Sequence, residues 1–250
     1  MFDANAAANY LIGQRKPDAI LAGALPEEFR PQSLQDAIAV QMATMAVLGP
    51  IGGWKVGAAN ATAEPSASPL ALSGICKSPG RVQVRTRIAE CEIGFTFAKA
   101  LPPRGTPYTA DEVLAAIGTC QPTIEAVDPR FISPSGLDQL TILADCGMHG
   151  GLVVGTPIAE WRPEMFAALH VVSTVNGAPQ REAVGSNPGG TDLMRLLVWL
   201  TNSEVVRAAG GLAAGAVVTT GSWTGADPLP PGAHVVGRFD GFAPVEATFT

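Results

Sequence analysis

Two glutamates, Glu90 and Glu92, interrupt an otherwise apolar, strand-like run, AECEIGFTF, at residues 89–97. Successive side chains of a β-strand point to opposite faces, so these two carboxylates share one face and lie side by side. Neighbouring carboxylates repel each other on an exposed strand, and in a buried strand they are very unfavourable unless a positive group stands between them. A bound cation would remove this difficulty.

A third acid, Glu125, lies in a second strand-like run, TIEAVD, beside Ile124 and Val127. We expect all three glutamates to lie inside the protein or to line a cleft. Three carboxylates suit Mg²⁺ or Mn²⁺, which are hard ions that take six ligands and would keep positions open for water or a chelating substrate. A Glu-x-Glu pair on a solvated strand face is the alternative interpretation of the spacing alone.

Lys55 is a candidate acid or base, because it lies between Trp54 and Val56 in the segment GWKVG. Apolar surroundings lower the pKa of a lysine towards the range useful for proton transfer, whereas a nearby carboxylate cluster raises it. The alternative is a lysine with a buried stem whose ammonium group reaches solvent.

His149, in ADCGMHGG, is a second candidate, since the neighbouring glycines let the backbone approach a ligand closely. His170 and His234 open apolar runs, and we expect them at strand ends. The sequence has no GxSxG, no P-loop and no strand-linked GxGxxG, so serine hydrolases, P-loop enzymes and Rossmann enzymes lack support.

Composition indicates a soluble globular protein of 250 residues with a net charge of −6 and 15% charged residues. The acidic balance argues against a nucleic-acid partner, and the low charged fraction is a weak indication of a homo-oligomer. Four cysteines without CxxC spacing predict a reducing compartment. We see neither a signal peptide nor a membrane-spanning segment, so we expect a cytoplasmic protein with no membrane partner.

Helices are expected near residues 4–15, 33–48, 109–118 and 192–209. Two of them carry capping signals, Ser33 with Asp36 and Thr109 with Glu112. From Gly52 onward, short runs punctuated by glycine and proline predict a β-rich core. The small, polar stretch 60–69 is expected to be a mobile loop that could act as a lid near Lys55.

Six segments in order resemble the 2-keto-4-pentenoate hydratase and oxalocrotonate decarboxylase branch of the fumarylacetoacetate hydrolase superfamily. The resemblance runs from about Leu34 to the C-terminus, and its carriers are GWKVG (53–57), AECEIGF (89–95), IEAVDPRF (124–131), LADCGMHGGLVVG (143–155), LVWLTN (197–202) and GLAAGAVVTTGSWT (211–224).

The resemblance implies an α+β protein: a mixed β-sandwich roll with an α-helical N-terminal part, usually oligomeric and dependent on Mg²⁺ or Mn²⁺. It implies a helical segment over residues 1–52 packed on a catalytic domain over residues 53–250. By matching position, Glu90, Glu92 and Glu125 would be the metal ligands and Lys55 the active-site lysine. The turn of Thr220, Gly221 and Ser222 would meet the substrate carboxylate.

The segment from Asp145 to His149 departs from the family pattern, because relatives commonly have an Asp-Asn-Ala-Ser type of segment there. Small, hydroxyl-bearing side chains of the family are thus replaced here by bulkier and ionisable ones. Near residues 74–78, relatives often place an acid where this chain has Lys77 or its neighbours. The carbon–carbon hydrolases of the superfamily use a His and Glu pair ahead of the metal motif, and no histidine precedes His149 here, which argues against hydrolysis.

The resemblance predicts a hydratase that adds water to a 2-hydroxy-2,4-dienoate, giving a 4-hydroxy-2-oxo acid, in the meta-cleavage catabolism of aromatic compounds. Lys55, with His149 or a water, would move protons. The alternative reaction is decarboxylation of a 2-oxo-dienedioate, and positive charge near Lys77 or Arg130 would favour it, whereas an apolar pocket would favour hydration. A third hypothesis is a non-catalytic relative whose pocket is blocked by Met148 and His149.

Overall fold

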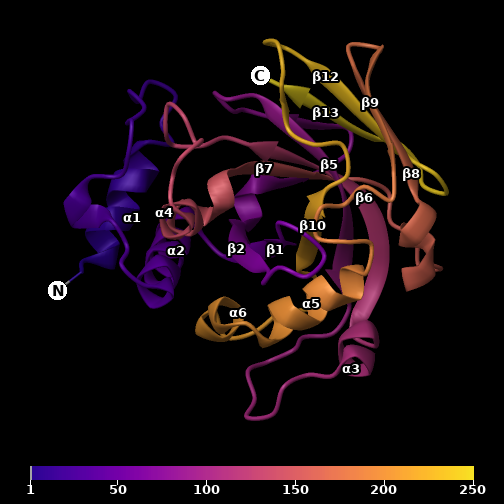
Figure 1. Ribbon diagram of the computed structural model, residues 1–250, viewed down its shortest axis with the longest axis horizontal. Helices are drawn as coiled ribbons and strands as arrows, with labels where there is room; N and C mark the ends of the chain where they lie inside the picture. The colour runs from indigo at the N-terminus through magenta and orange to yellow at the C-terminus, as the bar shows by residue number, and fades with distance from the viewer. Residues whose placement is uncertain (1) are drawn as a thin grey trace.

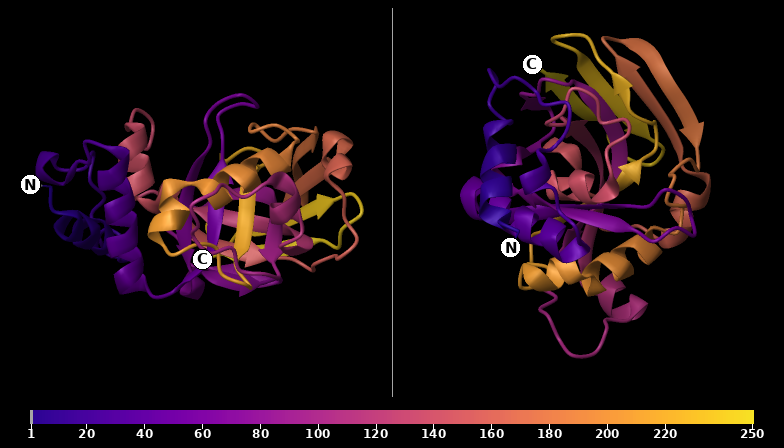
Figure 2. Two further views of the ribbon diagram at one scale, coloured as in Figure 1. Left: turned by 90° about the horizontal axis from the view of Figure 1, so that it is seen from below. Right: turned by 60° about the vertical axis from the view of Figure 1, so that its left-hand side comes forward.

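The computed structural model describes residues 2–250, and its helices lie at one end and along one side of a β-rich body (Figures 1 and 2). The helices are α1 (Ala4–Gly13), α2 (Leu34–Leu48), α3 (Ala110–Leu114), α4 (Gln139–Ala144), α5 (Leu193–Asn202) and α6 (Glu204–Ala208). None of the helices in this part of the chain is long and apolar enough to cross a bilayer.

The strands form two mixed sheets, which confirms the expected α+β class and mixed β-sandwich roll. The larger, eight-stranded sheet has the order β2 (Ser66–Ala71), β1 (Ile51–Gly57), β10 (Val217–Ser222), β5 (Ile88–Phe97), β6 (Ile117–Val127), β7 (His149–Val154), β3 (Ile75–Lys77), with β11 (Asp227–Pro228) paired to β5. The five-stranded sheet has the order β4 (Gly80–Val82), β13 (Val245–Phe249), β12 (His234–Phe239), β8 (His170–Val175), β9 (Ala178–Val184).

The antiparallel pair β5 and β6 lies inside the larger sheet and determines the position of the acids. In their register Glu90 is opposite Glu125, and Glu92 is opposite Thr123. Residues directly opposite each other in an antiparallel pair point to the same face, so the register alone brings acids from two strands together. His170 and His234 begin strands β8 and β12, as expected.

The N-terminal helices pack against a later part of the chain. Their apolar residues form one cluster with Phe131, Leu143 and Ala144. Helix α2 begins as expected, because the hydroxyl of Ser33 accepts a hydrogen bond from the backbone N–H of Asp36. Strand β1 begins at Ile51, and the division of the chain into 1–52 and 53–250 stays a prediction.

Three expected elements differ in the structure. The helix expected over 192–209 is broken at Ser203, whose hydroxyl accepts from the N–H of Val206 and starts α6. The helix expected over 109–118 ends at Leu114, because β6 begins at Ile117. Within the expected lid, residues from Ser66 onward form β2 and pair with β1, so only the residues before Ser66 form a loop.

A buried ion pair connects the segment after β6 to the end of α4. Arg130 and Asp145 form this pair, and their side chains are 1% and 0% exposed. Arg130 Nη1 also donates to the carbonyl of His149 at 2.9 Å, and Nη2 donates to the carbonyl of Asp145 at 2.7 Å. The guanidinium therefore satisfies the buried polar groups of Asp145 and His149.

Replacing Arg130 with methionine should lower the free energy of unfolding by about 3–5 kcal/mol, because it leaves the carboxylate of Asp145 buried without a partner. Urea denaturation of the wild type and of Arg130→Met measures the change. Arg104→Met is the matched control, since Arg104 pairs with Glu112 at the surface and its loss should have little effect. Equal losses in both variants would contradict the role of the buried pair.

Candidate active site

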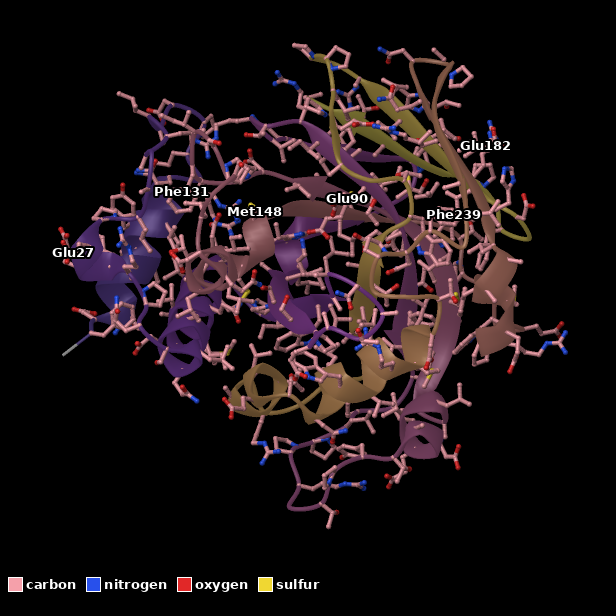
Figure 3. All side chains as sticks on the ribbon, in the orientation of Figure 1. Glu27, Glu90, Phe131, Met148, Glu182 and Phe239 are labelled. Carbon is pink, nitrogen blue, oxygen red and sulfur yellow. The ribbon has the colours of Figure 1, made fainter. Side chains whose placement is uncertain are left out.

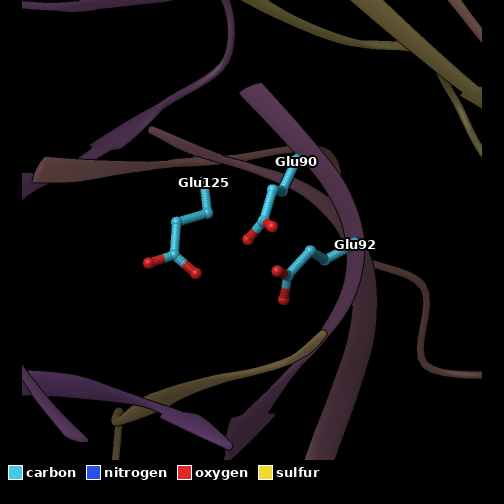
Figure 4. A group of neighbouring side chains, drawn as sticks. All are labelled: Glu90, Glu92 and Glu125. Atoms are coloured by element: carbon cyan, nitrogen blue, oxygen red, sulfur yellow. The ribbon is translucent and has the colours of Figure 1, made fainter. Parts of the chain in front are cut away.

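The carboxylates of Glu90, Glu92 and Glu125 converge on one point inside the larger sheet (Figure 4). One oxygen of each lies within 4.8 Å of the others. Glu92 and Glu125 are 1% and 0% exposed, so the alternative of a solvated strand face does not apply. Figure 3 shows Glu90 in the middle of the molecule, far from the surface acids Glu27 and Glu182.

Glu92 is held by two donors from strand β10. The hydroxyl of Thr219 and the backbone N–H of Gly221, at 2.7 Å, both donate to Glu92 Oε2. The register between β10 and β5 shifts between Thr219 and Ser222, and Gly221 has a φ of +96°. This bulge turns the Gly221 N–H towards Glu92, in a backbone conformation that favours glycine.

Glu125 uses one carboxylate oxygen for hydrogen bonds and leaves the other without a partner. Oε1 accepts from Lys55 Nζ at 2.7 Å and contacts His149 Nδ1 at 3.0 Å, whereas Oε2 is buried and has no partner. A buried carboxylate oxygen without a donor is unfavourable. Mg²⁺ and Mn²⁺ prefer hard oxygen ligands of this kind. The three carboxylates, with the unpaired Oε2 of Glu125 among them, therefore fit a divalent ion.

A left-handed turn fixes Lys55 from the other side. Cys146, Gly147 and Met148 have φ values of 50°, 61° and 61°, which non-glycine residues rarely adopt. The turn directs the carbonyl of Gly147 to Lys55 Nζ at 3.0 Å. A Cβ on Gly147 would lie 3.1 Å from Lys55 Cδ, so the lysine stem needs glycine at this position.

The charges of the site shift each other's pKa values. Burial raises the pKa of Glu90 to about 7, opposed by Lys55 and assisted by repulsion from Glu125. Burial, with repulsion from the other two acids, raises the pKa of Glu92 well above its usual value. Glu125 is equally buried, but Lys55 and His149 outweigh the burial and hold its pKa below the usual value.

Burial lowers the pKa of Lys55, but the three carboxylates outweigh it and raise the pKa to about 12. The carboxylate cluster, and not the apolar surroundings, therefore determines the protonation of this lysine. Lys55 is an ammonium group at neutral pH, able to donate a hydrogen bond or a proton. For His149 the direction is opposite, because burial holds its pKa below the usual value despite Glu125.

A cavity of about 280 Å³ opens beside these groups. Its polar lining includes Lys55, Glu90, Glu92 and Asn187, and its apolar lining includes Val56, Ala58, Ala67, Ile142, Leu143 and Met148. Among the described residues Lys55 is the one cation that lines it, since neither Lys77 nor Arg130 does so. Met148 lines the cavity without filling it.

The structure brings together most, but not all, of the predicted site residues. Lys55, Glu90, Glu92, Gly221 and Ser222 line the cavity, and Glu125 lies behind it against Lys55. His149 is 5% exposed and does not line the cavity, so its contact with the site is through Glu125 Oε1. Thr220 points away from the cavity, because its hydroxyl donates to the carbonyl of Ile93 at 2.7 Å.

Asn187 is a site residue that the sequence analysis missed. Its Nδ2 donates to the carbonyls of Thr220 and Gly221 at 2.9 and 3.1 Å, and its Oδ1 accepts from the N–H of Gly189 at 2.9 Å. It therefore ties the loop 187–190 to the bulge that holds Glu92. The Asn-Pro-Gly-Gly sequence at 187–190 signals a turn, but no local pattern indicates that this turn meets β10.

The sequence of this chain matches one known protein family over most of its length. A sequence profile described as fumarylacetoacetate (FAA) hydrolase C-terminal matches residues 47–250. The chain belongs to this family. A 4-oxalocrotonate decarboxylase from Pseudomonas sp. (strain CF600) is 27% identical over 158 residues, which are 63% of this chain and 59% of that relative. The match thus spans less than two thirds of the relative's length.

Several solved structures share the fold of this chain. The 4-oxalocrotonate decarboxylase from Pseudomonas putida G7, complexed with magnesium and adipate, superimposes with a TM-score of 0.80 at 23% identity, over 99% of this chain and 97% of that chain. The same protein was also solved with calcium and acetate. A 5-carboxymethyl-2-hydroxymuconate delta-isomerase from Mycobacterium smegmatis matches with a TM-score of 0.58 at 16% identity, over 80% of this chain and 78% of its own.

Removing one charge of the triad should abolish tight metal binding. We expect Glu92→Gln and Glu125→Gln to weaken Mg²⁺ or Mn²⁺ binding at least 100-fold, whereas Lys55→Met should keep it, since Lys55 is not a ligand. Isothermal titration calorimetry measures the affinities. Glu182→Gln, at an exposed glutamate of β9, is the matched control. Metal binding retained in both triad variants would contradict the assignment.

Metal affinity should increase with pH. Burial raises the pKa of Glu90 to about 7 and the pKa of Glu92 well above its usual value, and a cation binds the deprotonated forms. Affinity should therefore increase from pH 5.5 upward, by up to about tenfold per pH unit for each proton that the cation displaces. Mg²⁺ titrations between pH 5.5 and 8.5 measure the slope, and a flat profile would refute the shift.

Proposed function

We propose that this protein is a divalent-metal-dependent lyase that decarboxylates an unsaturated 2-oxo-dicarboxylic acid of the 2-oxo-dienedioate class. The observation that carries the proposal is the arrangement of the cavity, which has three carboxylates and one ammonium group at one end and an apolar wall at the other. The names of the two decarboxylase relatives support the same reaction.

The end of the cavity with the acids would bind the 2-oxo acid head of the substrate. A divalent ion held by Glu90, Glu92 and Glu125 would act as a Lewis acid and stabilise negative charge on the C2 oxygen. Lys55 pairs with Glu125 and lines the cavity, so its ammonium group would donate a hydrogen bond to the developing enolate and a proton to the product. Gly221 and Ser222 line the same end and are proposed to contact the substrate carboxylate.

The apolar wall, which the sequence analysis took as favouring hydration, can also promote loss of a remote carboxylate. The side chains of this wall provide neither a cation nor a hydrogen-bond donor for that group; they are Ala58, Ile142, Leu143 and Met148. A carboxylate in such surroundings is strongly destabilised, whereas neutral CO₂ is not. The electrons of the broken C–C bond are delocalised through the conjugated double bond to the C2 oxygen. The charged end of the cavity would stabilise the negative charge on that oxygen.

Hydration of a 2-hydroxy-2,4-dienoate is the second candidate, and the single cation of the cavity favours it. Lys55 can pair with one carboxylate group of the substrate, and a monocarboxylate needs no second cation. His149 lies outside the cavity, and we propose that it positions Glu125 in either reaction. The low charged fraction of 15% supports a homo-oligomer as the working form.

The two reactions are separated by an assay of a 2-oxo-3-hexenedioate and a 2-hydroxy-2,4-pentadienoate with Mg²⁺, scoring CO₂ and the 4-hydroxy-2-oxo acid separately. We expect metal-dependent CO₂ release from the dicarboxylate and a rate at least 100-fold lower for Lys55→Met, which should still bind metal. Hydration without CO₂ release would establish the second candidate. A lack of metal-dependent turnover of either acid would refute the proposed function.

A further inference from the structure

A second cavity of about 370 Å³ lies beside the metal cavity, where α2, α4, the α5–α6 junction and the loop before β2 meet. We call it the tail cavity. Its apolar walls are Leu34, Ile38, Pro65, Leu143, Trp199 and Val205. Its volume exceeds that of the metal cavity, and its apolar lining suits a hydrophobic group.

A thin partition separates the two cavities. Ser66, Ala67 and Leu143 border both of them, and two of these side chains are among the shortest. Behind the partition, Gln41 Nε2 donates to the carbonyl of Leu143 at 2.7 Å and to Ser68 Oγ at 3.0 Å. The tail cavity therefore shares part of its lining with the apolar wall of the metal cavity.

Charge and hydrogen bonding indicate what the tail cavity can accept. No lysine, arginine or histidine lines it within the described part of the chain, and the carboxylates of Glu64 and Glu204 border it, so an anionic group would be repelled. Gln41 is 1% exposed and also borders this cavity, and its Oε1 has no partner. A neutral, mainly apolar group fits the walls, and a hydroxyl on it would satisfy Gln41 Oε1.

We propose that the tail cavity holds an alkyl or aryl branch on the carbon chain of the substrate, beside the remote carboxylate, while the 2-oxo acid head lies at the three glutamates. This inference rests on the proposed function and narrows its substrate class to unsaturated 2-oxo-dicarboxylic acids that carry an apolar branch. The branch would enter past the side chain of Leu143, which borders both cavities. The branch then displaces water from an apolar surface, which favours binding.

The test compares the binding of 2-oxopentanoate and 2-oxononanoate to the Mg²⁺-loaded protein by calorimetry. We expect the longer acid to bind at least tenfold more tightly, since each buried methylene contributes about 0.8 kcal/mol. Val205→Trp fills the tail cavity, and Leu34→Trp narrows its partly exposed edge. Both should remove most of that preference, whereas Val184→Trp, at an exposed valine of β9, should keep it.

A second measurement uses the fluorescence of Trp199, which lines the tail cavity. The longer acid should change the emission more than the shorter one, and Trp199→Phe should remove this difference. Equal affinity of the two acids, or a preference that survives in both cavity variants, would overturn the inference. Neither measurement needs turnover, so a chain-length preference without any lyase activity would refute the proposed function and leave the tail cavity standing.

Discussion

The structure depends on how three carboxylates are kept in the interior of one sheet. Lys55 compensates for only part of their charge, and burial leaves Glu90 and Glu92 with raised pKa values. A divalent cation would supply the remaining positive charge, and its preference for oxygen ligands matches the donors that are present. The register of β5 and β6, the bulge of β10 and the left-handed turn after α4 all serve this arrangement.

Two of the three acids are each restrained through one carboxylate oxygen, which leaves their other oxygen available. Glu92 uses Oε2 for Thr219 and Gly221, and Glu125 uses Oε1 for Lys55 and His149. The donors come from several strands, so the positions of the oxygens depend on the whole sheet. Preorganisation of this kind lets a site stabilise charge without rearranging during the reaction.

Strand periodicity predicted the central acids, because alternation holds along β5 and β6. The same rule fails in β10, where the bulge near Gly221 changes which side chains share a face, so Thr220 points away from the cavity while Ser222 lines it. Asn187 and the tail cavity also lay beyond sequence reasoning. They are formed by segments far apart in the chain, and tertiary packing alone brings those segments together.

The family profile matches from residue 47 onward, yet two earlier side chains reach the surroundings of the site. Arg15 Nη1 donates to the carbonyl of His149 at 3.3 Å, and Gln41 joins β2 to α4. The surroundings of the site therefore include residues from outside the matched segment. Change in the N-terminal helices offers a route by which specificity could diverge while the metal ligands stay the same.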